Sequence, residues 1–304
     1  MKRNITLLYS VTFALLRTLN SFSQSNDNCV SIDNCVSIDF LSAINQEDVS
    51  AYQKVLLEHN PTWVLDRQAY ERTIQDFILS GKNYRSSNSI ITIPVVVHVV
   101  YNLPVENISD NQIFSQIQVL NEDYGRTNPD TVNTPGPFLG IAANTGIQFC
   151  LAQRDPNGNL CTGIERRQTT VTSFATNDAM KFYNQGGLDI WDPTRYLNIW
   201  VCNLGNTGIG GYGEFPTGNI SSTFGAVIHY GVFGSNYTSY GVFADVSSFA
   251  PFDRGRVATH EIGHCFNLYH IWGDDGTACT GTDYCNDTPN QGGPTSGCYL
   301  FPHT

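Results

Sequence analysis

Apolar residues recur along this chain of 304 residues in patterns that predict a central sheet. Residues 90–101 form a near-continuous β-branched run, which is typical of a strand buried on both faces. Residues 197–202 and 224–230 are shorter runs of the same kind and predict two further strands. His98 lies within the first run, and we interpret it as a core histidine rather than a metal ligand.

Three other segments have helical patterns. Residues 47–79 are helix-prone and charged, with an interruption at Pro61. Ser109 and Gln112 have the spacing of a capping box, after which apolar side chains recur at helical spacing. A third helix is expected beyond Asp253, its candidate N-cap. The predicted buried faces comprise Ile113, Ile117, Leu120 and Tyr124 in the second helix, and Ala258, Ile262, Cys265 and Phe266 in the third.

The third helix carries the most specific motif of the sequence. Residues 260–270 read HEIGHCFNLYH, which fits the pattern H-E-x-x-H-x-x-N-x-x-H. His260 and His264 lie one turn apart on the same helix face and can bind one metal ion together. His270 can join them only if the chain leaves the helix and turns back. Three imidazole ligands leave the fourth position of a tetrahedral zinc ion open for water, as in catalytic rather than structural sites.

Glu261 directly follows the first of these histidines. From that position a carboxylate can reach a water molecule at the open zinc position and accept its proton. The pattern therefore predicts a hydrolase in which His260, His264 and His270 bind Zn²⁺ and Glu261 is the general base. The alternative is a helix whose histidines only point to solvent.

The motif resembles the zinc signature of the metzincin metallopeptidases, and its flanks resemble the pappalysin family. The flanks are IPVVVHVVY at 93–101, WDP at 191–193, YLNIWV at 196–201, HIWGD at 270–274 and DTP at 287–289. Metzincins usually have glycine where this chain has Asn267, and asparagine is the next best residue for the left-handed conformation required there. The resemblance runs from about residue 90 to the end of the chain.

The resemblance implies an α/β (α+β) fold: a metzincin-like catalytic domain with a twisted mixed sheet, an active-site helix and an irregular C-terminal subdomain. It also implies a zinc metalloendopeptidase that acts on protein or peptide substrates. In metzincins an edge strand holds extended substrate by main-chain hydrogen bonds. We expect residues 211–215 to form that strand here, with Gly211, Tyr212 and Gly213 binding substrate. A solvated loop with no role in substrate binding is the alternative.

Two features of the C-terminal part bear on activity and on a second metal. Metzincins place a methionine-containing turn downstream of the third histidine, whereas Met1 and Met180, the only methionines, both precede the motif. We therefore interpret the chain as truncated, so that a catalytically impaired zinc- and calcium-binding extracellular module is the alternative function. Residues 273–288 are rich in aspartate, which suits Ca²⁺. By resemblance Asp283 and the carbonyl group of Thr288 would be its ligands, and simple solvated acidic residues are the alternative.

The N-terminal part predicts export and processing. Residues 1–23 have the charged start, the apolar run and the small residues of a signal peptide, which predicts a secreted protein, with a membrane anchor as the alternative. Residues 24–88 are interpreted as a pro-segment and linker with processing candidates Lys82 and Arg85, and residues 89–304 as the peptidase domain. An ordinary helical extension is the alternative to a pro-segment. A repeated hexapeptide supplies Cys29 and Cys35, either of which could cap the zinc ion in a latent form.

Charge and cysteine content narrow the partners and the compartment. A formal net charge of −11 argues against nucleic acid and anionic membranes as partners. Nine cysteines in an exported chain suggest disulfides, and Cys150 and Cys161 flank a turn at residues 155–158 that a local bridge could close. In the pappalysin family, downstream cysteines pair with counterparts of Cys279 and Cys298.

Overall fold

The computed structural model describes residues 61–80, 90–205, 207–273, 281–285, 288 and 292–293. Several predictions concern residues outside these ranges: the signal peptide, Cys29 and Cys35, Lys82 and Arg85, and Cys279 and Cys298. Within the described ranges, no helix combines the length and the apolar character that a membrane span requires.

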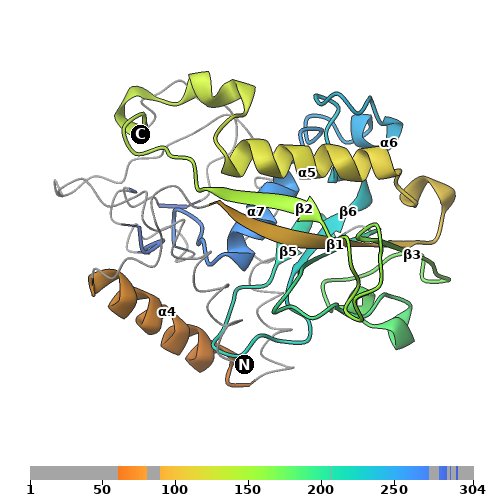
Figure 1. Ribbon diagram of the computed structural model, residues 1–304, viewed down its shortest axis with the longest axis horizontal. Helices are drawn as coiled ribbons and strands as arrows, with labels where there is room; N and C mark the ends of the chain where they lie inside the picture. The colour runs from red at the N-terminus through yellow and green to blue at the C-terminus, as the bar shows by residue number, and fades with distance from the viewer. Residues whose placement is uncertain are drawn as a thin grey trace.

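A six-stranded mixed sheet forms the centre of the fold (Figure 1). The strand order is β2-β1-β4-β6-β5, and β3 pairs with the second half of β1. All pairs are parallel except β5 with β6, so β5 is an antiparallel strand at one edge. The strands are β1 (Ile91–Tyr101), β2 (Ile147–Leu151), β3 (Ile164–Gln168), β4 (Leu197–Cys202), β5 (Gly211–Gly213) and β6 (Ala226–His229). The three strands predicted from apolar runs, β1, β4 and β6, are confirmed and pair side by side.

His98 lies in the buried middle of β1 and is fully enclosed. Its Nδ1 lies 2.8 Å from Glu165 Oε2, and its Nε2 lies 2.8 Å from Asn198 Oδ1. The ring also stacks on Trp200, with 4.9 Å between ring centroids. Both nitrogens therefore have partners within the sheet, which confirms the prediction of a core histidine.

Helices α5 (Asp110–Tyr124) and α7 (Arg256–Cys265) pack on one face of the sheet. Figure 1 shows α5 running along β1 and β2. The predicted apolar faces of both helices enter one core cluster with side chains of β1, β4 and β6, and only Ile117 is half-exposed. A short helix, α6 (Ala244–Ser247), precedes α7. The remaining helical turns are η2 (Pro104–Glu106), η3 (Pro129–Asn133), η4 (Gly136–Phe138), η5 (Ala179–Lys181), η6 (Tyr183–Gln185) and η7 (Tyr230–Val232).

The opposite side chains of the same strands form a second core cluster. Trp200 of β4, Val227 of β6 and Tyr212 of β5 pack there against Met180 of η5. Trp63, the first residue of α4 (Trp63–Leu79), joins this cluster. The helix predicted after Pro61 is thus present, and its start is anchored to the sheet.

Two capping predictions are wrong in part. Ser109 Oγ accepts the Gln112 N–H at 3.2 Å, as predicted, but the Gln112 side chain does not return to Ser109. Its amide instead donates to the Phe233 carbonyl group at 2.9 Å, because long-range packing offers a buried acceptor. Helix α7 begins after Gly255, whose φ of 73° is left-handed and costs glycine little, so Asp253 is not its N-cap.

The predicted bridge between Cys150 and Cys161 is also wrong. The turn between them forms, since Arg154 and Leu160 pair across it as an antiparallel bridge. Both thiols are nevertheless free: Cys150 is exposed on β2, whereas Cys161 Sγ lies 3.4 Å from the Ala152 carbonyl oxygen. The buried Cys202 and Cys265 are free thiols as well.

Candidate active site

Helix α7 ends in a turn that brings the third histidine back beside the first two. Asn267 has a φ of 73°, the left-handed conformation predicted for this position. The Asn267 N–H donates to the His264 carbonyl group and the Leu268 N–H donates to the Gly263 carbonyl group, both at 2.9 Å. This pair of bonds is the Schellman arrangement, which satisfies the last carbonyl groups of the helix while the chain reverses.

The three predicted histidines meet at one point. His260 Nε2 lies 3.1 Å from His264 Nε2 and 3.2 Å from His270 Nε2. All three candidate ligand atoms lie within 4.8 Å of one another, and among the described residues no other group of three metal-ligating side chains was found. Neutral imidazole nitrogens converging in this way can hold a transition-metal ion.

Neighbouring groups fix the orientation and charge of these rings. His264 Nδ1 lies 2.7 Å from the Leu268 carbonyl oxygen, so the proton lies on Nδ1 and Nε2 carries the electron pair. The His270 ring stacks on Trp272 with 4.3 Å between centroids and an angle of 5°. Burial, with the adjacent His264 and His270 rings, holds the pKa of His260 well below its usual value, so that His260 is neutral at physiological pH. The neutral form is the one that binds metal.

Glu261 is buried between α7 and β5, with 8% of its surface exposed. Burial raises the pKa of its carboxyl group to about 8, and a hydrogen bond from the Gly213 backbone N–H opposes that rise. A carboxyl group whose pKa lies close to neutral pH can accept a proton and later release it, as a general base must.

Strand β5 passes directly over this glutamate. A Cβ atom built on Gly211 would lie 3.2 Å from Glu261 Cγ, and one built on Gly213 would lie 2.1 Å from the Glu261 carbonyl oxygen. Only glycine therefore permits this approach. On the inner side of β5, the Glu214 N–H donates to the Gly225 carbonyl group at 3.1 Å. In an antiparallel pair, every second residue bonds the neighbouring strand and the residues between turn their main-chain groups away from it. Gly211 and Gly213 are the residues that face away from β6.

The remaining predicted site residues do not meet the histidines. Tyr212 points its side chain into the second core cluster, so only its main chain lies at the edge. Asp283 Oδ1 accepts the Cys285 N–H at 2.9 Å, and the Thr288 N–H donates to the Cys285 carbonyl group at 3.2 Å. The acidic side chains Asp274, Asp275 and Asp287 of the same loop lie outside the described residues.

Helix α4 contacts the turn between the second and third histidines, which sequence reasoning did not foresee. Asn267 Nδ2 donates to Glu71 Oε2 at 2.9 Å, and Arg67 donates to the Tyr269 hydroxyl group. Arg67 also donates to the Pro216 carbonyl group at 2.6 Å, just beyond β5. Arg67 and Glu71 are both buried, at 5% and 7% exposure. Their sequence carries no motif, and only the spacing of two opposite charges four residues apart hinted at a pair.

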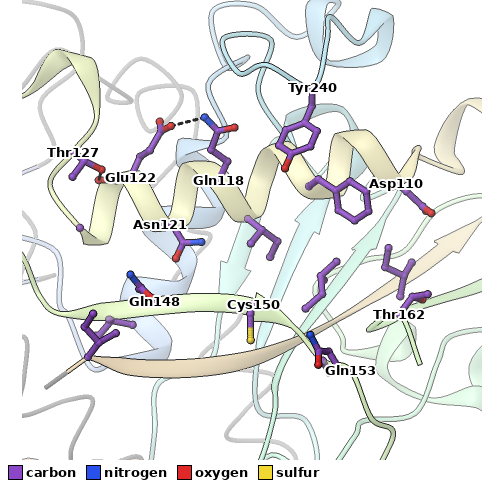
Figure 2. Close-up of a pocket in the computed structure, with 18 of the residues that line it drawn as sticks. Asp110, Gln118, Asn121, Glu122, Thr127, Gln148, Cys150, Gln153, Thr162 and Tyr240 are labelled. Atoms are coloured by element: carbon purple, nitrogen blue, oxygen red, sulfur yellow. Dashed lines mark hydrogen bonds between the residues drawn. The ribbon is translucent and has the colours of Figure 1, made fainter. Parts of the chain in front are cut away.

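A cavity of about 900 Å³ lies elsewhere, between α5 and β2 (Figure 2). None of the three histidines lines it, and neither does Glu261. Its two carboxylates have partners, since Asp110 pairs with Arg166 at 2.5 Å and Glu122 accepts from Gln118 at 2.5 Å. The lining of the cavity therefore contains no cluster of catalytic groups.

Comparison with known proteins finds extracellular metalloproteases among the proteins to which this chain is similar. The family model described as Pregnancy-associated plasma protein-A matches residues 183–299. An extracellular metalloprotease of Arthroderma otae is 29% identical over 216 residues, covering 68% of this chain and 62% of the relative. Extracellular metalloprotease 1 of Coccidioides posadasii is 32% identical over 219 residues, with the same coverage. The chain thus spans about six tenths of the length of these curated relatives.

Solved structures match more closely. Mature mirolysin of Tannerella forsythia, in complex with a cleaved peptide, is 52% identical with a TM-score of 0.66, covering 71% of this chain and 78% of that one. A promirolysin mutant from the same organism is 45% identical with a TM-score of 0.72, covering 86% of this chain and 79% of that one. Together with the mixed sheet and the histidine turn, these matches show that the chain belongs to the pappalysin family of metzincin metallopeptidases.

Proposed function

We propose that this protein is a secreted zinc metalloendopeptidase. The observation that carries the proposal is the convergence of His260, His264 and His270 beside the buried Glu261. The extracellular metalloproteases among its relatives support both the reaction class and the compartment.

The donor set suits zinc. Two nitrogen ligands at about 2.0–2.1 Å from a tetrahedral zinc ion lie about 3.3 Å apart. The distances from His260 Nε2 to His264 Nε2 and to His270 Nε2, 3.1 and 3.2 Å, are close to that value. When bound, zinc would activate a water molecule and polarise the carbonyl group of the substrate.

The residues of the chain then have separate roles. His260, His264 and His270 hold the ion, and the Leu268 carbonyl group keeps the His264 ring turned toward it. Glu261 accepts a proton from the attacking water and hands it to the leaving amine. The Gly213 N–H, which bonds the Glu261 carboxylate, keeps that base in place between the two transfers.

The outer edge of β5 is the proposed binding place for the substrate main chain. Gly211 and Gly213 turn their main-chain groups outward there, where the Gly213 N–H bonds Glu261 and the remaining groups face the cleft, and among the described residues no further strand pairs with β5. An extended peptide can add to such an edge as one more strand. The cleaved peptide in the mature mirolysin complex supports a peptide substrate.

Residues 24–88 are proposed to be a pro-segment that restrains this site. Helix α4 within it binds both Asn267, in the histidine turn, and Pro216, just beyond the rim of the cleft. The match to promirolysin covers 86% of this chain and that to mature mirolysin 71%, as expected if the N-terminal part is a removable segment. Cleavage within residues 81–89 would then free the turn. Glu71→Gln should speed proteolytic activation, and an unchanged activation rate would contradict this role.

Calcium binding by Asp283 and Thr288 remains a separate proposal. The aspartate content of the loop supports it, because calcium prefers carboxylate and carbonyl oxygens. Calorimetric titration with Ca²⁺ of the wild type and of Asp283→Asn would test it. Equal heats for the two proteins would contradict this assignment.

Cleavage of a fluorogenic peptide by the purified chain tests the main proposal. The wild type should cleave, a zinc chelator should abolish cleavage, and Glu261→Gln should lower kcat by about 10²–10⁴-fold while keeping one zinc ion per chain. The matched control is Glu122→Gln, which changes a glutamate of α5 that lines the other cavity and should retain activity. A wild type that binds one zinc ion but still cleaves no peptide after proteolytic removal of residues 24–88 would contradict the proposal and favour a zinc-binding module.

A further inference from the structure

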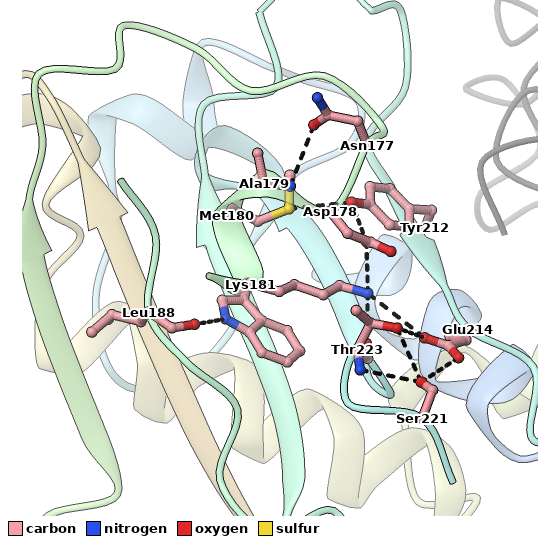
Figure 3. A network of polar contacts seen from close by, with 11 residues as sticks. Asn177, Asp178, Ala179, Met180, Lys181, Leu188, Tyr212, Glu214, Ser221 and Thr223 are labelled. Carbon is pink, nitrogen blue, oxygen red and sulfur yellow. Dashed lines mark hydrogen bonds and ion pairs between the residues drawn. The ribbon is translucent and has the colours of Figure 1, made fainter. Parts of the chain in front are cut away.

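The back of β5 is attached to a buried polar cluster that the proposed mechanism does not use. Side chains alternate along a strand, so Tyr212 and Glu214 point away from α7, opposite to Gly211 and Gly213. Figure 3 shows both side chains turned toward Lys181. We call Lys181, Asp178, Tyr212, Glu214, Ser221 and Thr223 the lysine cluster.

Lys181 lies at the centre of this cluster and is 1% exposed. Its Nζ lies 2.8 Å from Asp178 Oδ1 and 4.0 Å from Glu214 Oε2. The ammonium group also donates to the Thr223 carbonyl group at 2.7 Å. These partners come from three segments of the chain, one before β4, one directly after β5 and one before β6.

Tyr212 in β5 and Glu214 directly after it both end in the lysine cluster. The Tyr212 hydroxyl group lies 3.0 Å from Asp178 Oδ1. Glu214 accepts from the Ser221 hydroxyl group at 2.5 Å and from the Thr223 hydroxyl group at 2.9 Å. Gly213 lies between these two residues, so the strand is attached on both sides of the glycine that touches Glu261.

The buried charge of Lys181 requires the partners that surround it. A lysine taken out of water is stable only when opposite charges and acceptors surround it, and a methionine would fill the same space without that requirement. Burial raises the pKa of Glu214, whereas the Lys181 charge and the two hydroxyl donors lower it. The cluster is thus mutually dependent: removing Lys181 leaves Asp178 and Glu214 buried without a cation.

Strand β5, the rim strand of the cleft, depends on the contacts with the lysine cluster to stay in place. It has three residues, two of them glycine, and it pairs only with β6 among the described strands. Glycine has more conformational freedom than any other residue, and a short edge strand has few ladder bonds to restrain it.

We propose that Lys181 is a positioning residue for substrate binding: through Asp178 and Glu214 it fixes the rim strand β5 against which an extended peptide binds. The part that concerns the peptide rests on the proposed function. The part that concerns the strand does not, and the two are tested by different measurements.

Hydrogen exchange of the full chain tests the strand. Lys181→Met should raise amide exchange in residues 210–216 by about tenfold, and Tyr212→Phe, which removes one hydroxyl group, by about fivefold. Exchange in β1 should stay unchanged. Arg166→Met is the matched control, because it removes an ion pair on β3 at the far side of the sheet. If Lys181→Met does not fold, Tyr212→Phe and Ser221→Ala decide the question. Wild-type exchange at residues 210–216 in the folded variants would overturn the proposal.

Cleavage of peptides of two lengths tests the consequence for substrate. A peptide of about eight residues can lie along β5, whereas one of about four residues reaches little beyond the scissile bond. In the variants KM for the long peptide should rise by about tenfold, with kcat/KM for the short peptide nearly unchanged. An equal loss for both lengths would indicate general damage and would overturn the positioning role. If the wild type cleaves neither peptide, the proposed function fails, while the exchange result still decides whether Lys181 fixes the strand.

Discussion

Replacing Gly213 with alanine should push the rim strand away from the active-site helix. The added Cβ would lie 2.1 Å from the Glu261 carbonyl oxygen and 3.2 Å from His264 Cβ. Ordinary contacts between carbon atoms lie at about 3.5–4.0 Å, so the strand or the helix must move by more than about 1 Å. The nearest atom belongs to the backbone of α7 and cannot rotate aside as a side chain could.

The magnitude of the effect follows from this displacement. Overpacking of this kind costs about 1–3 kcal/mol, which for a domain of this size lowers Tm by roughly 2–12 °C. A misplacement of about 1 Å between catalytic groups and substrate costs about 10²-fold in rate. We therefore expect Gly213→Ala to lower both Tm and kcat/KM, the second more severely.

Gly218→Ala, in the loop that follows β5, is the matched control. A Cβ at Gly218 would meet no atom within 4 Å, and this change should be neutral or slightly stabilising because alanine restricts the unfolded chain. The assays are thermal unfolding followed by circular dichroism, and cleavage of a fluorogenic peptide. The close packing of β5 on α7 would be refuted if Gly213→Ala and Gly218→Ala had the same Tm and the same kcat/KM.

Three further predictions concern the metal, pH and the histidine turn. An ion that binds only the folded state stabilises that state, so chelation of zinc should lower Tm and re-addition of zinc should restore it. An unchanged Tm after chelation would argue against a bound ion. Burial above all raises the pKa of Asp123 to about 6 from 3.8, so the folded state binds this proton more tightly than the unfolded state. The free energy of unfolding should then fall by about 3 kcal/mol as pH rises from about 4 to 6. Urea titrations should show that Asp123→Asn lacks this pH dependence. The same pH dependence in the wild type and the variant would contradict the prediction. In urea unfolding, Asn267→Ala should be about 1 kcal/mol less stable than Asn267→Gly. Both variants lose the hydrogen bond to Glu71, but only alanine is strained at a φ of 73°. Equal stabilities would count against that strain.

Much of the candidate site is encoded locally. His260 and His264 share a face because a helix repeats every 3.6 residues, and Asn267 supplies the left-handed residue that ends the helix. Long apolar runs likewise predicted β1, β4 and β6, since a strand buried on both faces must be apolar throughout. Sequence reasoning erred where a neighbour distant in sequence competed with a local partner. Gln112 bonds Phe233 rather than Ser109, and Cys161 packs away from Cys150.

The sequence by itself therefore determined which three histidines converge and which glutamate lies beside them, and it located β1, β4, β6 and the helices α4, α5 and α7. Those features depend on periodicity and on conformational preference, which act over a few residues. Only the tertiary structure decided that β5 touches Glu261, that α4 binds the histidine turn, and that Lys181 is buried behind the rim strand. These contacts join segments far apart in the chain, and their stability depends on desolvated charges and close backbone approach, which leave no local pattern in the sequence.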